Sequence, residues 1–311
     1  MNNINKYFNL NSPTSVSVDI TKACNLKCVH CYNDSGKKAS DELTSAELLK
    51  LFEDLATLNI VNVCLCGGEP LCSPIVYDLM RVIKGKCASI NMVSNGFLID
   101  EKVINNLVDA GLNVLQISLD GCTAMEHDSF RGVAGSFDAA IRAIKLAREK
   151  KLQVLVSCCI NKINFKNLEK YLKLCCDLGI SSIRFSMLIP IGRCSKSDNL
   201  ILTTEEFLEA KRIINQSKLN VAIEFSDPIA HIQSIAKMSE IGLENNIVII
   251  KVNGDVGISP FVPISFGNIR NTSLTKLWDE ILSKSWTDPK TVNVFSSIET
   301  VYDIQNANNI I

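Results

Sequence analysis

Short apolar runs alternate along the chain with longer segments whose apolar residues recur every three or four positions. The first pattern predicts β-strands and the second predicts amphipathic α-helices. The expected strands are residues 16–20, 61–65, 89–93, 113–119, 153–159 and 181–187, and the expected helices are residues 44–58, 74–84, 100–110, 136–150, 165–178 and 204–217. These βα repeats of roughly 30 residues predict an α/β fold. It is either a partial (β/α)6 TIM-like barrel or a doubly wound sheet, because a full eight-stranded barrel takes about 250 residues.

Local signals mark the ends of several of these helices. Thr44 and Thr203 each stand three residues before a Glu, the spacing of a capping box at a helix N-terminus. Gly111 and Gly179 stand where a helix should end before the next strand. The boundaries therefore agree with the periodicity.

The βα rhythm ends near residue 200. An extended stretch at 221–225 is followed by apolar runs at 247–252 and 256–259, which Asn253-Gly254 joins in a pattern typical of a tight hairpin turn. A last helix is expected over 273–284, before a polar tail that starts at Asp288. The predicted organisation is a core barrel over residues 1–200, a small α+β C-terminal domain over 201–287, and a polar tail over 288–311.

Composition narrows the function. Of 311 residues, 47% are hydrophobic, and 32 basic residues balance 33 acidic ones, which argues against nonspecific binding to nucleic acid or an anionic membrane. The N-terminus lacks a secretory signal and no apolar stretch reaches the ~18 residues of a membrane helix, so a cytoplasmic protein is expected. In that compartment thiols stay reduced, and 13 cysteines, all between Cys24 and Cys194, indicate metal or redox chemistry rather than disulfides.

The most specific motif is a cysteine cluster directly after the first expected strand. Cys24, Cys28 and Cys31 are spaced by three and two residues. Three thiolates on one short loop can hold three corners of a [4Fe-4S] cube and leave the fourth iron open. The alternatives are a zinc site with His30 as the fourth ligand, or a chance cluster in a cysteine-rich chain.

Further motifs follow the next three expected strands. Two glycines and a Glu would let the backbone approach a ligand and offer a carboxylate to an ammonium group. An Arg would bind a carboxylate through its planar fork. Taken singly, each motif also reads as an ordinary turn or a solvated side chain. The residues concerned are Gly67, Gly68, Glu69 and Pro70, then Ser94 and Asn95 before a Gly, and then Ser118 and Asp120 with Arg131 downstream.

These motifs, in this order, resemble those of the radical S-adenosylmethionine (radical SAM) enzymes, in particular the subgroup with SPASM or twitch C-terminal domains. The resemblance covers most of residues 15–285. It implies that Cys24, Cys28 and Cys31 hold one [4Fe-4S] cluster, whose open iron binds the methionine end of SAM. An external one-electron donor such as a flavodoxin or ferredoxin then drives SAM cleavage to a 5′-deoxyadenosyl radical that abstracts a substrate hydrogen. The SAM contacts that it implies are His30, Gly67, Gly68, Glu69, Pro70, Ser94, Asn95, Ser118, Asp120 and Arg131.

The C-terminal third departs from the subgroup pattern. Phe261 follows Pro260 where relatives carry a cysteine, and no cysteine follows Cys194, so no thiolate there can hold an auxiliary cluster. A one-cluster enzyme fits a redox-neutral reaction, such as a peptide epimerisation in which a thiol returns the hydrogen. Cys66, just before Gly67, and Cys122 are the candidate hydrogen donors, each with a buried packing role as the alternative. The Cys158-Cys159 and Cys175-Cys176 pairs are expected to be packing residues.

The favoured function is the maturation of a ribosomally synthesised peptide. A radical SAM enzyme that acts on a small molecule, such as a sugar or a cofactor precursor, is the alternative within the family. A noncatalytic iron–sulfur sensor is the alternative from another class. The Gly67–Pro70 motif and Arg131 argue against the sensor, because a protein that only binds a cluster has no need of them.

Overall fold

The computed structural model describes residues 11–217, 219, 221–240 and 243–310. The strands are β1 (Ser15–Asp19), β2 (Asn62–Cys66), β3 (Ser89–Ser94), β4 (Val114–Ser118), β5 (Gln153–Ile160), β6 (Ser182–Met187), β7 (Ala222–Ser226), β8 (Ile247–Ile250) and β9 (Val256–Gly257). The helices are α1 (Ser45–Thr57), α2 (Val76–Ile83), α3 (Glu101–Ala110), α4 (Ala124–Arg131), α5 (Ser136–Glu149), α6 (Leu168–Asp177), α7 (Thr204–Gln216), α8 (Pro228–Glu240), α9 (Leu274–Glu280), α10 (Pro289–Ser296) and α11 (Val301–Ile310).

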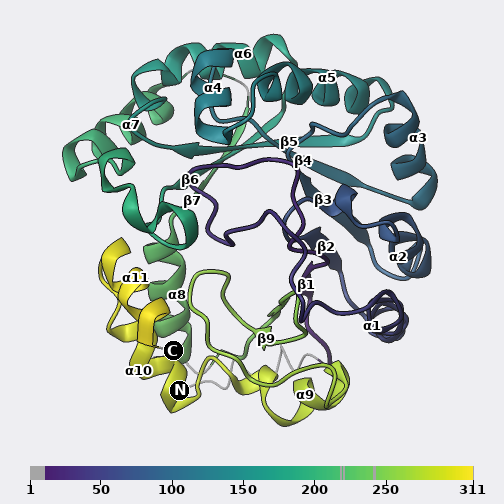
Figure 1. Ribbon diagram of the computed structural model, residues 1–311. Helices are drawn as coiled ribbons and strands as arrows, with labels where there is room; N and C mark the ends of the chain where they lie inside the picture. The colour runs from purple at the N-terminus through teal and green to yellow at the C-terminus, as the bar shows by residue number, and fades with distance from the viewer. Residues whose placement is uncertain (1–10, 218, 220, 241–242, 311) are drawn as a thin grey trace.

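The nine strands form one curved sheet in the order β7-β6-β5-β4-β3-β2-β1-β8-β9. Every neighbouring pair is parallel except β8 and β9. The sheet curls around a central space with α1 to α7 on its outside, and α8, α10 and α11 lie together beyond β7 (Figure 1). In the described part of the chain β7 and β9 pair with no strand on their outer sides, so the barrel is partial, as the sequence predicts.

Alternation along the strands separates an apolar outer face from a polar inner face, here called the lumen face. On β2, Val63 and Leu65 are buried towards the helices, whereas Cys64 and Cys66 are half-buried on the other side. Strands β4, β5 and β6 show the same alternation of buried and half-buried positions. Parallel strands covered on both faces usually read as continuous apolar runs. Here the polar inner positions indicate that the sheet surrounds a site rather than a second core.

Helix ends follow the expected signals. Thr44 and Thr203 form complete capping boxes with the Glu three residues on. Gly111 ends α3 in the left-handed conformation at φ 100°. Periodicity did not predict α4 or α8; α4 is short and rich in polar residues, with few positions on an apolar stripe. Among the described residues, no helix combines the length and apolar character needed to cross a membrane.

The C-terminal third extends the sheet at both edges. β7 pairs with β6 at one edge, and β8 pairs with β1 at the other, with the expected β8–β9 hairpin beyond it. The polar tail expected over 288–311 is wrong, because its described part forms α10 and α11. Phe295, Ile298 and Ile304 are almost fully buried there. Phe295 lies on α10, Ile298 in the turn after it and Ile304 on α11, so single apolar side chains spread over both helices and the turn are buried in an otherwise polar segment.

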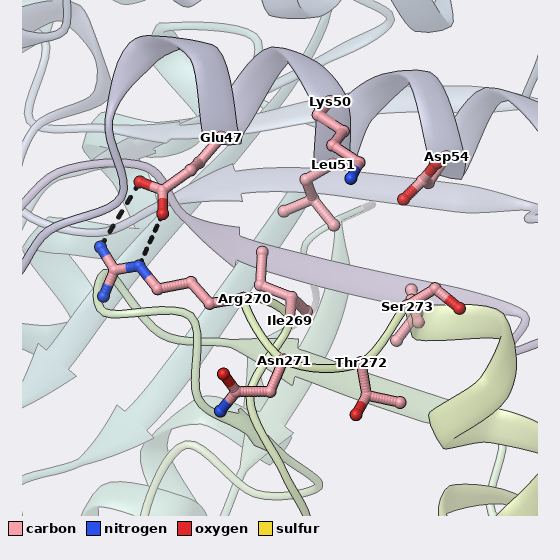
Figure 2. Close-up of a pocket in the computed structure, with 10 residues that line it drawn as sticks. Glu47, Lys50, Leu51, Asp54, Ile269, Arg270, Asn271, Thr272 and Ser273 are labelled. Carbon is pink, nitrogen blue, oxygen red and sulfur yellow. Dashed lines mark hydrogen bonds and ion pairs between the residues drawn. The ribbon is translucent and has the colours of Figure 1, made fainter.

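Arg270 ties this C-terminal third to α1. Its guanidinium pairs with Glu47 at 2.7 Å and also donates to the backbone carbonyls of Asp41, Glu42 and Asn253. A surface cavity of about 230 Å³ lies beside this contact, between α1 and residues 269–274 (Figure 2). The hydrogen bonds of the Arg270 guanidinium connect the C-terminal third to α1 and the loop before it, so we assign Arg270 a structural role.

Candidate functional site

A second cavity, of about 390 Å³, opens at the carboxyl ends of the strands, where active sites of parallel barrels lie. The predicted residues that line it are Cys24, Cys28, His30, Cys31, Cys66, Gly67, Gly68, Ser94, Asn95, Ser118, Asp120 and Arg131. Glu69, Pro70 and Cys122 are not among the described lining residues. The fold therefore brings motifs from four successive loops to one place.

Arg193, in the segment after β6, holds in place the loop after β1 that carries Cys24, Cys28 and Cys31, here called the cysteine loop. The Arg193 Nε donates to the Cys28 carbonyl at 2.9 Å, and its Nη1 donates to the Ser35 carbonyl at 2.7 Å and to Asp34 at 2.8 Å. Its backbone N–H also donates to the Cys31 carbonyl. Sequence reasoning missed Arg193, because more than 150 residues separate it from its partners and nothing local marks it.

Gly67 and Gly68 are required by the chain itself. A Cβ on Gly67 would lie 2.4 Å from the Thr21 carbonyl oxygen, and one on Gly68 would lie 2.3 Å from the Ala23 carbonyl oxygen. Gly67 also has φ 126°, a region that favours glycine. The backbone N–H groups of Gly68 and Glu69 donate to those two carbonyls. The two glycines thus allow the start of the cysteine loop to pack closely against the loop after β2. The sequence alone did not reveal this reason for them.

Glu69 is 1% exposed and turns towards the loop after β3. Its carboxylate accepts hydrogen bonds from the Ser94 hydroxyl at 2.9 Å and the Asn95 backbone N–H at 2.8 Å. Burial raises the pKa of Glu69 to about 7, against the opposing effect of these hydrogen bonds. Asn95 in turn donates to the Asn25 side chain at 2.9 Å. The carboxylate therefore ties the β2, β3 and cysteine loops together beneath the cavity.

Asp120 and Arg131 form a buried ion pair in the cavity wall. The Arg131 Nε donates to Asp120 at 2.5 Å, and its Nη1 points to the Cys28 sulfur at 3.7 Å. Burial acts to raise the pKa of Asp120, but the Arg131 charge, together with smaller effects such as the hydrogen bond from the Cys159 N–H, holds that pKa below its usual value. The Asp120 backbone N–H donates to Nδ1 of His127, which is fully buried and whose pKa burial lowers to about 4. His127 is thus a neutral support for the pair.

His30 packs flat against Phe130. The ring centroids are 3.9 Å apart and the planes differ by 4°. Burial lowers the pKa of His30 to about 3, so its imidazole is neutral at physiological pH. In this position it forms part of an aromatic wall beside the three cysteines.

Each of the three motif thiols has its own N–H donor. The Asn95 amide approaches the Cys24 sulfur at 3.9 Å, the Arg131 guanidinium approaches Cys28, and the Ser35 backbone N–H donates to Cys31 at 3.3 Å. Such donors suit sulfurs that carry thiolate charge. Among the described residues, no three His, Cys, Asp or Glu side chains are grouped to hold a single metal ion. Three cysteine thiols, each with an N–H donor, fit three corners of a [4Fe-4S] cluster.

Cys66 is the candidate hydrogen donor that reaches the cavity. It lies on the lumen face, 3.4 Å from the Cys64 sulfur. Cys122 instead donates to the Glu126 carboxylate at 3.3 Å, outside the lining. Cys159, expected to be a packing residue, also lines the cavity, because β5 points Cys158 into the core and Cys159 into the lumen. Strand alternation predicts that Cys158 and Cys159 lie on opposite faces of the sheet. It does not say which of them faces the cavity.

The floor of the cavity carries a polar network that the sequence did not indicate. Arg184 on β6 donates to Gln116 on β4 at 3.0 Å and to Glu224 on β7 at 2.9 Å. Ser157 and Ser186 line the same space. Period-2 alternation could have marked these as inner positions, since each stands between buried apolar neighbours or at a strand end.

The model of the radical SAM superfamily matches residues 18–191. The chain belongs to the radical SAM superfamily. Enzymes of this superfamily use a [4Fe-4S] cluster and S-adenosylmethionine, and the three thiols described above are the residues of this chain that fit the cluster. Phe261 packs edge-on against His231, with ring centroids 6.1 Å apart, and lines the cavity.

Curated relatives of this radical SAM enzyme act on different substrates. The AdoMet-dependent heme synthase of Methanosarcina barkeri is 26% identical over 86% of this chain and 83% of its own length. The mycofactocin maturase MftC of Mycobacterium tuberculosis is 33% identical over 59% of this chain. The sporulation killing factor maturation protein SkfB of Bacillus subtilis is 29% identical, also over 59%. The chain spans about half the length of these two maturases, 47% and 45%.

Solved structures share the fold. Streptococcus suis SuiB bound to S-adenosylmethionine superimposes with a TM-score of 0.69 at 15% identity, covering 91% of this chain and 70% of SuiB. The AdoMet-bound anSMEcpe superimposes with a TM-score of 0.68 at 17% identity, covering 92% of this chain and 85% of that protein. At these identities the likeness establishes the partial barrel and its C-terminal extension only.

Proposed function

We propose that this radical SAM enzyme modifies a ribosomally synthesised peptide by abstracting a hydrogen and returning one from Cys66, so that the net reaction is redox-neutral, as in an epimerisation. The observation that carries the proposal is the Cys66 thiol, which lines the same cavity as the three motif cysteines. The similarity to MftC and SkfB supports a peptide substrate.

The residues divide the work by their positions. Cys24, Cys28 and Cys31 would hold the cluster, which with SAM supplies a 5′-deoxyadenosyl radical when both are bound. Arg131 would bind the SAM carboxylate; in support, its guanidinium lies in the cavity wall and only part of its fork is used by Asp120. Glu69 keeps Ser94 and Asn95 in place beside the cavity.

Cys66 would then donate its hydrogen to the substrate radical. An S–H bond is weak enough to give a hydrogen atom to a carbon radical, and the half-buried position of Cys66 on the lumen face leaves its sulfur open to the cavity. Electrons enter from an external donor of the flavodoxin or ferredoxin class.

Turnover in deuterated water tests this proposal. We expect one deuterium at the attacked carbon of the peptide, since thiol hydrogens exchange with solvent. Cys66→Ala should still cleave SAM but form no deuterated product, whereas Cys159→Ala, the matched control in the same cavity, should keep both activities. A product two mass units lighter than the substrate, formed equally by the Cys66 variant, would refute the donor role and the redox-neutral reaction together.

A second candidate substrate class is a small molecule. The heme synthase alignment favours it, because that alignment extends over 86% of this chain whereas the maturase alignments end at 59%. Parallel assays of 5′-deoxyadenosine release with a precursor peptide and with an iron porphyrin precursor separate the two. Stimulation by the porphyrin alone would replace the peptide proposal.

A further inference from the structure

We propose that Cys64 and Cys66 act as a redox pair, in which Cys64 captures the thiyl radical that Cys66 carries after it donates its hydrogen. The inference rests on the proposed function of Cys66 and adds a catalytic partner for it. Its basis is the 3.4 Å separation of the two sulfurs on the lumen face of β2. The other two cysteines with lumen-facing or nearby sulfur, Cys159 and Cys122, contact no second thiol at this distance in the described residues.

A bond between these sulfurs needs a local distortion of β2, because Cβ atoms two residues apart on a strand stand about 6.6 Å apart, beyond the roughly 3.5–4.5 Å of a disulfide. Residues two apart on a strand are separated by about 6.6 Å between Cα atoms, at the long end of the roughly 4.4–6.8 Å range of disulfides. A Cys64–Cys66 disulfide would therefore be strained and easily reduced. That property suits a bond that must open again in every catalytic cycle.

The local electrostatics give the two thiols different roles. The hydrogen bond between the two sulfurs lowers the pKa of the Cys64 thiol and raises that of Cys66. Asp19, the register partner of Cys66 on β1, is 5% exposed, and burial raises the pKa of its carboxyl. Cys64 is thus the thiol of the pair that loses its proton more readily, while Cys66 keeps the hydrogen that it donates.

The step balances as follows. The substrate carbon radical takes the hydrogen atom of the Cys66 S–H bond, which breaks as the C–H bond forms. Cys64 releases its proton to solvent, and the resulting thiolate adds to the Cys66 thiyl radical and forms a disulfide radical anion. This anion gives one electron to an oxidised carrier of the flavodoxin or ferredoxin class and becomes a neutral disulfide. A small dithiol then reduces the disulfide and restores both S–H bonds.

The first test measures the pair without turnover. The cluster-loaded enzyme is equilibrated anaerobically with mixtures of reduced and oxidised glutathione, alkylated and digested with trypsin, so that Cys64, Cys66 and Cys72 share the peptide of residues 51–81. We expect this peptide to lose two hydrogens and to carry one alkyl group, on Cys72. The disulfide should persist in Cys72→Ala and vanish in Cys64→Ser. Three alkyl groups at every glutathione ratio, or loss of the disulfide in Cys72→Ala, would overturn the proposal.

The second test follows turnover with a precursor peptide. Without added dithiol, the wild-type enzyme should form one Cys64–Cys66 disulfide per product and stop, and dithiothreitol should restore repeated turnover. Cys64→Ser should make at most one product per enzyme even with dithiothreitol. Repeated turnover of Cys64→Ser at the wild-type rate would overturn the role of Cys64. A wild-type enzyme that forms the disulfide in glutathione but yields no peptide product would instead refute the proposed function and leave the redox pair standing.

Discussion

Replacement of Arg193 should loosen the cysteine loop without touching a cluster ligand. Arg193→Ala removes two charge-assisted hydrogen bonds to the Cys28 and Ser35 carbonyls, at 2.9 and 2.7 Å. Each such bond contributes roughly 1.5–3 kcal/mol, and the third, to the well-exposed Asp34, contributes about 0–1 kcal/mol. Because the Arg193 side chain is 29% exposed, water replaces part of this loss. We expect the ordered conformation of the loop to be destabilised by about 3 kcal/mol. This shifts the equilibrium between the ordered and the open loop about 100-fold towards the open one.

Iron release to a chelator under anaerobic conditions measures this effect. If the cluster leaves through the open loop, Arg193→Ala should release iron about 100-fold faster than the wild type, since about 1.4 kcal/mol is tenfold. Arg193→Lys, which keeps the charge but not the fork, should be intermediate. Arg212→Ala is the matched control, because Arg212 makes an exposed ion pair with Glu209 on α7. Release from Arg193→Ala at the wild-type rate would refute the reasoning.

Three further outcomes are expected. Anaerobic reconstitution should give about four iron and four sulfide per chain for a single [4Fe-4S] cluster, and essentially none after all three motif cysteines are replaced by Ala; a stable content near twice that would reveal a second cluster site. Arg131→Ala should weaken SAM binding roughly 10- to 100-fold. Arg131→Lys still pairs with the buried Asp120 and therefore controls for misfolding. Unchanged SAM affinity in both variants would contradict the assigned contact. Because burial lowers the pKa of His127 from 6.5 to about 4, its contribution to stability is present above pH 6.5 and is lost as pH falls towards 4. The loss amounts to about 3 kcal/mol, so urea unfolding of His127→Gln should depend less on pH between 6.5 and 5 than that of the wild type, and equal slopes would contradict this.

The sequence predicted most of the barrel because its signals are local. Periodicity located the first six strands, Asn253-Gly254 marked the β8–β9 hairpin, and the cysteine spacing marked the loop that faces the cavity. β7 was foreseen only as an extended stretch, and β8 as a hairpin strand without its pairing to β1, because pairing with β6 and β1 is decided by contacts far apart in the chain. The two C-terminal helices were missed for a related reason, since their few apolar side chains are buried by packing against distant parts of the chain, such as α8.

The site was predictable in composition but less so in arrangement. Cys24, Cys28, Cys31 and Cys66 line one cavity as expected, because the loops that carry them follow neighbouring parallel strands. The support from Arg193 and the lumen position of Cys159 depend instead on how distant loops meet and on which strand face turns inward. For the same reason the glycines of the Gly67–Pro70 motif suggested a ligand, whereas the structure shows that the Thr21 and Ala23 carbonyls require them.

The place of β1 in the sheet has a consequence for biosynthesis. β1 carries the cysteine loop, and one of its two edges is covered by β8, which lies more than 220 residues later in the chain. During translation at about 5–20 residues per second, that edge stays uncovered for at least ten seconds or so after β1 leaves the ribosome. Unpaired strand edges of this kind bind other chains readily. Chaperone protection of the nascent chain, and delivery of iron and sulfide only after release from the ribosome, should therefore raise the yield of active enzyme.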